Sequence, residues 1–229
     1  MQLVNNWDLY RYAHRGGGTT DTRFKSLVER TITDFSDDSD ITIGAYAFAS
    51  CTKLTNINLP NLTSLGTSRA FQDCQSLITI NFPNLTGRLG IGAFAECSNL
   101  REANLPKLNS LDNAAFYNCI NLRSIHIPNV SGMRYQAFEK CANLTTIDLP
   151  SLTSMTGSIF KSCTSLIAVI LRAPVVATMS DKYTFQNTPI ASGTGYIYVP
   201  DELVDSYKNA TNWTVYADQI KPLSEYGGD

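Results

Sequence analysis

This sequence lacks most of the patterns that mark an enzyme or a metal site. It contains only two histidines, and none of its six cysteines lies in a Cys-x-x-Cys pair, the spacing typical of zinc sites. The glycine run at 16–18 is not followed by the Gly-Lys-Ser/Thr of a phosphate-binding loop. The acidic run at 37–40 lacks the glycine and the closing glutamate of a calcium loop. We therefore predict no enzymatic activity, no metal site and no cofactor.

Long apolar runs and an excess of one charge are also missing. No stretch approaches the roughly 20 apolar residues that a membrane-spanning helix needs. The formal net charge is −2, which gives no reason to expect nucleic acid as a partner. Polar residues interrupt positions 1–15, so this segment lacks the apolar core of a secretory signal peptide. We expect neither membrane insertion nor a Sec export signal in the chain as written.

The chain does contain one motif in six copies. Each copy has a phenylalanine, a cysteine three residues later, a leucine three residues after that, and then a stretch close to Ile-x-Leu-Pro. The motif positions are Phe48, Phe71, Phe94, Phe116, Phe138 and Phe160, with Cys51, Cys74, Cys97, Cys119, Cys141 and Cys163. A unit of 22 or 23 residues is too small to bury a hydrophobic core alone, so the units are expected to stack as a solenoid.

Each copy also predicts its own local structure. Apolar residues alternate over Ile-x-Leu, which indicates a short strand that pairs in parallel with its neighbours one coil away. The proline that follows ends this strand. The Phe-x-x-Cys-x-x-Leu stretch has apolar residues at spacing three, which favours one helical or 3₁₀ turn at the corner. Two copies have an extra residue, one between Leu65 and Phe71 and one between Leu85 and Leu89, where we expect outward bulges.

The six cysteines occupy the same place in successive coils. Neighbouring thiols in such a column would lie about 5 Å apart. Side chains stacked in parallel do not present the dihedral angle near 90° that a disulfide needs. We therefore predict six buried free thiols that pack as small apolar side chains.

The Phe-x-x-Cys-x-x-Leu pattern over residues 43–171 resembles the BspA-type leucine-rich repeats, a bacterial family. The resemblance implies a right-handed solenoid with a parallel β-sheet on one face, short helical or irregular returns on the other, and helix-containing caps at both ends. It implies a non-catalytic surface or secreted protein that binds another protein, such as a host extracellular-matrix or cell-surface protein. Because no export signal is recognised, a cytoplasmic or phage-associated location stays open.

The chain divides into four parts on this basis: a flexible arm (1–18), an N-terminal cap (19–42), six repeats (43–171), and a degenerate repeat with a C-terminal cap (172–229). In the N-terminal cap we expect a helix at 21–30 and a strand at 31–35. In the C-terminal cap we expect a strand at 196–199, a helix from Asp201 to about Tyr207, and Trp213 and Tyr216 sealing the core. Whether residues 172–195 form a seventh coil stays open.

The residues that flank each inward isoleucine are predicted to point outward and to form two columns on the strand face. The candidate binding residues are Asn56, Asn58, Thr79, Asn81, Glu102, Asn104, Ser124, His126, Thr146 and Asp148, and the columns continue to Ala168 and Ile170. The face is polar and mostly uncharged, with no aromatic residue in these positions. Three interpretations remain: a protein-binding or adhesion surface, a plain solvated face, or an accessory part of a phage, prophage or other assembly docked through residues 1–18.

Overall fold

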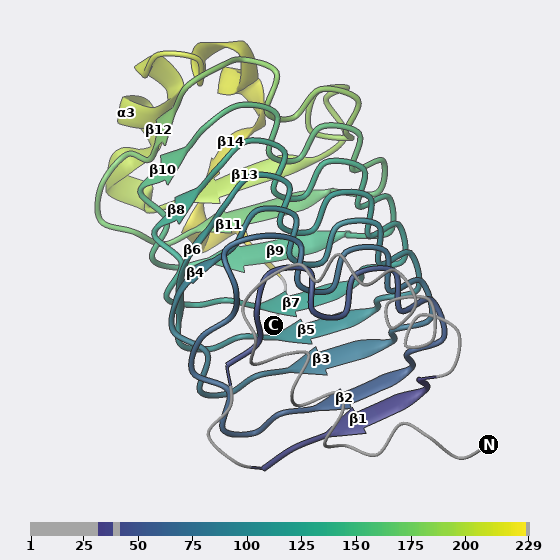
Figure 1. Cartoon of the computed structure of the whole chain (residues 1–229). Coiled ribbons are helices and arrows are strands. Elements are labelled where there is room, and N and C mark those ends of the chain that lie inside the picture. The colour runs from purple at the N-terminus through teal and green to yellow at the C-terminus, as the bar shows by residue number, and fades with distance from the viewer. Residues whose placement is uncertain (1–31, 39–41, 228–229) are drawn as a thin grey trace, which may run out of the picture.

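The computed structural model describes residues 32–38 and 42–227. Figure 1 shows the chain winding through stacked coils, each of which adds a parallel strand to one row. The predicted solenoid is confirmed. The N-terminal arm and the helix expected at 21–30 lie outside the described residues.

The first row of strands holds the candidate binding residues. Its members are β1 (Asp34–Ser36), β2 (Asn56–Asn58), β3 (Thr79–Asn81), β5 (Glu102–Asn104), β7 (Ser124–His126), β9 (Thr146–Leu149), β11 (Ala168–Leu171), β13 (Tyr196–Val199) and β14 (Ile220–Pro222). They form three parallel groups, β1–β2, β3–β5–β7 and β9–β11–β13–β14. β2 still lies beside β3, and β7 beside β9, so the row continues along the solenoid.

A second row of strands lies on the return side of the coils, where the sequence predicted irregular or short helical structure. It consists of β4 (Gly87–Leu89), β6 (Leu108–Leu111), β8 (Gly132–Met133), β10 (Ser154–Met155) and β12 (Thr178–Met179), paired in parallel as one five-stranded sheet. The register shifts between Gly87 and Arg88, and Gly87 has a φ of 74°. The bulge expected between Leu85 and Leu89 is therefore confirmed.

The third side of each coil is built from turns, and the helical turn predicted there is wrong. The residue before each cysteine has a φ between 57° and 66°, in the left-handed region. These residues are Ser50, Asp73, Glu96, Asn118, Lys140 and Ser162. Cys51 N–H donates to the Phe48 carbonyl three residues back at 3.1 Å, whereas Phe48 N–H donates to the Ala70 carbonyl of the next coil at 2.8 Å. A positive φ in the third position is typical of a type II turn, and the bonds between coils replace those of a helix.

A stack of phenylalanine rings forms the centre of the core. The six repeat phenylalanines and Phe185 lie face to face, with successive ring centroids 5.0–5.6 Å apart. All of these rings are buried. Phe185 continues the stack and β12 pairs with β10, so the chain winds through one more coil after Leu171.

The six cysteines are buried, and none of them forms a disulfide, as predicted. The Cys97 thiol donates to the carbonyl of Phe71 in the preceding coil at 3.1 Å. The same contact recurs at Cys74, Cys119, Cys141 and Cys163, at 3.0–3.2 Å. The column therefore adds a line of hydrogen bonds between coils to its apolar packing.

The C-terminal cap closes the end of the solenoid. It contains the 3₁₀ helices η1 (Asp201–Leu203), η2 (Thr214–Gln219) and η3 (Leu223–Glu225) and the α-helix α3 (Val204–Asn209). Trp213 and Tyr207 are fully buried, and Tyr216 packs edge-on against Phe185 with centroids 5.2 Å apart. The expectation that Trp213 and Tyr216 seal the core is confirmed.

Candidate functional site

The outward side of the first row carries the predicted binding residues in two columns. The central residue of each strand points inward, as buried Ile57 and Ile80 show, and its neighbours point outward. One column aligns Thr79, Glu102 and Ser124, and the other aligns Asn81, Asn104 and His126. Asn56, Asn58, Thr79, Asn81, Glu102, Ser124, His126 and Asp148 are exposed, and Asn104 and Thr146 are half-buried. Their role in binding remains a prediction.

Asparagine side chains of this face form ladders between coils. Asn104 Nδ2 donates to Asn81 Oδ1 at 2.8 Å, and Asn56 Nδ2 donates to Asp34 Oδ1 at 2.6 Å. The bond from Asn56, together with one from Thr33, lowers the pKa of the Asp34 carboxyl. The ladders fix the orientation of these amides before any partner arrives.

Other candidate residues have side-chain polar atoms that make no hydrogen bond within the described part of the chain. Within the described part of the chain, no side-chain hydrogen bond involves Thr79, Glu102, Ser124, His126 or Thr146. These groups can therefore bond to a partner without breaking a contact inside the protein.

The columns change character at their C-terminal end. Ala168 and Ile170, which the sequence placed outward, are buried. They pair in register with Tyr196 and Tyr198 of β13, whose large side chains are their neighbours in the next strand. The two columns thus continue onto tyrosines, and Lys221 of β14 follows Tyr198.

Tyr196, Tyr198 and Tyr226 form a tyrosine cluster on this face. The Tyr198 ring centroid lies 6.3 Å from that of Tyr196 and 4.8 Å from that of Tyr226. Tyr196 is 38% exposed, and the Lys221 ammonium lies 5.8 Å from its ring centre. Partial burial raises the pKa of the Tyr198 hydroxyl. The tyrosines follow the repeats, so the six-repeat columns missed them, although the strand at 196–199 was the signal that could have revealed them.

The charged groups beside the tyrosine cluster are paired with one another. Arg172 Nε contacts both Asp148 oxygens at 3.0 and 3.1 Å, and Lys221 Nζ lies 3.8 Å from Glu225 Oε2. Each pair is neutral overall. This end of the face therefore combines aromatic surface with balanced charge.

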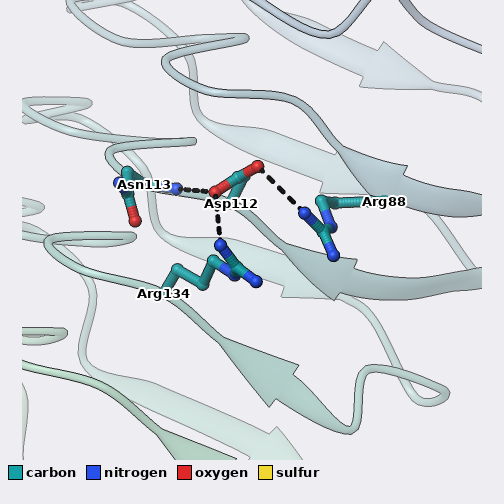
Figure 2. Close-up of polar contacts among 4 residues, drawn as sticks. All are labelled: Arg88, Asp112, Asn113 and Arg134. Atoms are coloured by element: carbon teal, nitrogen blue, oxygen red, sulfur yellow. Dashed lines mark hydrogen bonds and ion pairs between the residues drawn. The ribbon is translucent and has the colours of Figure 1, made fainter.

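A further polar cluster lies on the second row and spans three coils, as Figure 2 shows. Asp112 Oδ2 lies 3.5 Å from Arg88 Nη1, and Asp112 Oδ1 lies 3.9 Å from Arg134 Nη1. The Asn113 backbone N–H also donates to Oδ1 at 2.9 Å. The Asp112 side chain is largely shielded, whereas both arginines are about half exposed. This cluster links successive coils at a place remote from the first-row columns.

The described residues give little support for covalent or metal chemistry. Burial raises the pKa of Cys119 and Cys141 well above the usual value, and it raises that of Cys163 to about 12. Buried protonated thiols are poor nucleophiles. Among residues 32–38 and 42–227, no group of three or more His, Cys, Asp or Glu side chains could hold a metal ion.

No helix in the described part of the chain has the length and apolar character to cross a membrane.

Several solved structures resemble this chain. A leucine-rich repeat protein from Bacteroides ovatus matches with a TM-score of 0.47 and 22% identity, over 74% of this chain and 56% of that one. The pneumococcal vaccine antigen PcpA matches with a TM-score of 0.40 and 15% identity, over 83% of this chain and 66% of that one. A leucine-rich cell surface protein from Faecalibacterium prausnitzii matches with a TM-score of 0.32 and 18% identity, over 82% of this chain and 70% of that one. No curated protein matches the sequence.

The sequence also matches the family model for the BspA-type leucine-rich repeat region. The match contains six copies and covers residues 22–129 and 107–202. These residues include every repeated phenylalanine and cysteine of the core. The chain belongs to the BspA-type leucine-rich repeat family.

Proposed function

We propose that this chain is a non-catalytic protein-binding module of a bacterial surface protein, and that its partner lies along the outward side of the first row. The observation that carries the proposal is the register of β13, which adds Tyr196 and Tyr198 to the two polar columns after β11. Tyrosine is enriched among residues that dominate binding energy at protein interfaces. The row therefore combines an aromatic anchor with a longer polar strip.

The polar strip suits the rest of such an interface. Exposed groups such as Thr79, Ser124 and His126 repeat from coil to coil, with a strand spacing of about 4.8 Å. They offer hydrogen bonds at regular intervals along a rigid surface. Family membership supports a protein partner, including host extracellular-matrix or cell-surface proteins.

A binding screen tests this proposal. The purified chain would be applied to immobilised extracellular-matrix proteins and bacterial cell-wall fractions, beside a variant carrying Asn104→Ala, His126→Ala and Tyr196→Ser. We expect the variant to lose most of the binding while its melting temperature falls only slightly, because His126 and Tyr196 are exposed and Asn104 makes one side-chain hydrogen bond, to Asn81.

The control changes a different side of the solenoid, in the coils of β9 and β11. Ser154 and Thr178 are exposed on the second row, so Ser154→Ala with Thr178→Ala should bind like the wild type. Equal losses in both variants, or full binding by the first-row variant, would contradict a partner on the first row.

A further inference from the structure

Tyr135 is an exposed aromatic side chain remote from the first row. It follows β8 and is 48% exposed. Its side chain extends over Gly157 of the next coil, where a Cβ atom would lie only 2.5 Å from Tyr135 Cε2 and 3.1 Å from Cδ2. The absence of a side chain at Gly157 therefore makes room for the tyrosine ring.

A carboxylate reaches the same place from the other direction. Asp181, in the coil after Gly157, directs Oδ2 into the space that a Cβ of Gly157 would fill. The Tyr183 backbone N–H donates to the other oxygen, Oδ1, at 2.8 Å and so holds the carboxylate in place. Within the described residues, neither Asp181 Oδ2 nor the Tyr135 hydroxyl has a hydrogen-bond partner. The edge of the Tyr135 ring and the unpaired Oδ2 of Asp181 thus lie together above Gly157.

The other tyrosines on the turn side of the coils have cations beside them. Tyr117 accepts a hydrogen bond from Lys140 Nζ at 2.6 Å, and this ammonium also lies 5.0 Å from the ring centre. Tyr46 accepts one from Arg69 at 2.9 Å, and the Tyr183 ring has Lys182 Nζ at 5.6 Å. No such cation lies over Tyr135 among the described residues. Its ring surface is therefore open to a ligand.

Polar groups also lie on the N-terminal side of Tyr135. Asn113 occupies the equivalent position in the preceding coil, since Ala114 N–H donates to the Tyr135 carbonyl at 2.8 Å. Figure 2 shows Asn113 beside Asp112 and Arg134, the residue that precedes the tyrosine. Residues with hydrogen-bonding side chains therefore occupy the neighbouring coils on both sides of Tyr135.

We propose that Tyr135, Gly157 and Asp181 form a carbohydrate-binding subsite for one neutral pyranose ring. The C–H face of the sugar packs on the exposed tyrosine ring, and the open oxygen of Asp181 accepts hydrogen bonds from sugar hydroxyls. A charged acceptor strengthens such hydrogen bonds. The subsite is separate from the first row, so it stands or falls independently of the protein-binding proposal.

The test is a saturation-transfer NMR titration of the whole chain with four probes: the methyl pyranosides of glucose, galactose, mannose and N-acetylglucosamine. We expect saturable binding of at least one probe, with an affinity in the range of about 1–10 mM that suits a single exposed ring. Tyr135→Ala should weaken that binding at least about tenfold, because the stacking surface is lost. Asp181→Asn should weaken it several-fold while keeping an oxygen for the Tyr183 N–H.

Two further variants sharpen the result. Gly157→Ala adds only a methyl group, yet it must displace the Tyr135 ring or the Asp181 carboxylate, so it should also abolish binding. Tyr117→Ala removes a tyrosine whose ring already has a cation and should leave binding unchanged. The proposal is overturned if no probe binds the wild type, or if Tyr135→Ala binds as the wild type does. It is also overturned if Tyr135→Ala abolishes capture of a protein partner while no glycoside binds, because Tyr135 would then belong to a protein interface.

Discussion

The repeated body and the C-terminal cap of this solenoid satisfy their backbone polar groups in different ways. In the body, a backbone N–H of one coil donates to a carbonyl of the next, as from Phe94 to Ala115 at 2.9 Å and from Phe116 to Ala137 at 2.8 Å. At the end of the stack, side chains of the cap provide the donors instead. They are Trp213 Nε1 to Ala177 at 2.7 Å, Asn212 Nδ2 to Met179 at 2.7 Å, and the Tyr216 hydroxyl to Lys182 at 2.5 Å.

This difference shows that repetition provides hydrogen-bond partners for the backbone. A body coil gains most of its partners because the neighbouring coil has the same shape, and its side-chain donors, such as the cysteine thiols, recur from coil to coil. The cap has no such neighbour and depends on a few side chains that each fill one position. We therefore expect the stability of the body to depend on features that all of its coils have in common. The stability of the cap should depend on a few single residues.

The largest expected effect is alkaline unfolding through the body thiols, which act together. Burial raises the pKa of Cys74, Cys119, Cys141 and Cys163 above the usual value of 9.0. The unfolded chain therefore ionises first, so the stabilisation is complete below the pKa of the free thiol and is lost as pH rises toward the folded value. Each thiol should lower the free energy of unfolding by about 1.4 kcal/mol per pH unit in that window.

Urea denaturation between about pH 7.5 and pH 10.5 measures this slope. Cys141→Ala should have a shallower slope, because one ionising group is gone. A thiol reagent should label none of the six cysteines in the folded chain at neutral pH. Rapid labelling of all six, or a stability that does not change with alkaline pH, would contradict the buried column.

The next largest effect is expected in the cap, at Trp213. Trp213→Ala should lower the free energy of unfolding by about 3–5 kcal/mol, because it leaves a cavity and an unpaired carbonyl at Ala177. Trp213→Phe retains much of the packing and should cost about 1–3 kcal/mol, chiefly through the lost hydrogen bond. Equal stability of both variants and the wild type in urea would show that the cap does not seal the stack.

A single core position of the body should cost about as much or slightly less. Leu122 is fully buried in the middle of the stack, and Leu122→Ala should cost about 2–5 kcal/mol through the cavity. Thr145→Ala, at an exposed position in the following coil, provides a control that should change stability by less than about 0.5 kcal/mol. If Leu122→Ala and the control unfolded at the same urea concentration, close packing at this coil would be disproved.

The smallest effect is expected near the C-terminal end of the body, between the coils of β9 and β11. Arg172 contacts Asp148 with both partners nearly half exposed, so solvent screens the pair. Arg172→Gln should reduce the free energy of unfolding by about 0.2–1 kcal/mol, and this small loss should shrink further in high salt. A loss several times larger would mean that the packing of these two coils depends on this ion pair.

Several local features of the fold were predictable because each coil repeats the same physical pattern. Alternation over Ile-x-Leu located the first-row strands, and the shared position of the cysteines indicated free thiols rather than disulfides. The turn side was not predictable in this way. Apolar spacing of three fits a helical turn as well as it fits successive β-turns, and only hydrogen bonding to the next coil favours the turns. The short second-row strands likewise become recognisable only when coils pair.

The candidate binding face was predictable for the same reason, up to the end of the repeats. The outward positions of Thr79, Ser124 and His126 follow from strand alternation alone. The tyrosine cluster did not follow from it, because Tyr226 comes from a segment outside the repeat pattern and reaches Tyr198 through the folding of the cap.

By itself, the sequence determined the length of the coil and the residues that fill its core, since a 22- or 23-residue period with apolar columns allows only a stacked solenoid. Only the tertiary structure decided which outward residues become neighbours. Tyr135, Gly157 and Asp181 belong to three successive coils, and nothing in the local sequence of any one coil indicates that they meet. Their proximity depends on the stacking register and on the space left by a missing side chain.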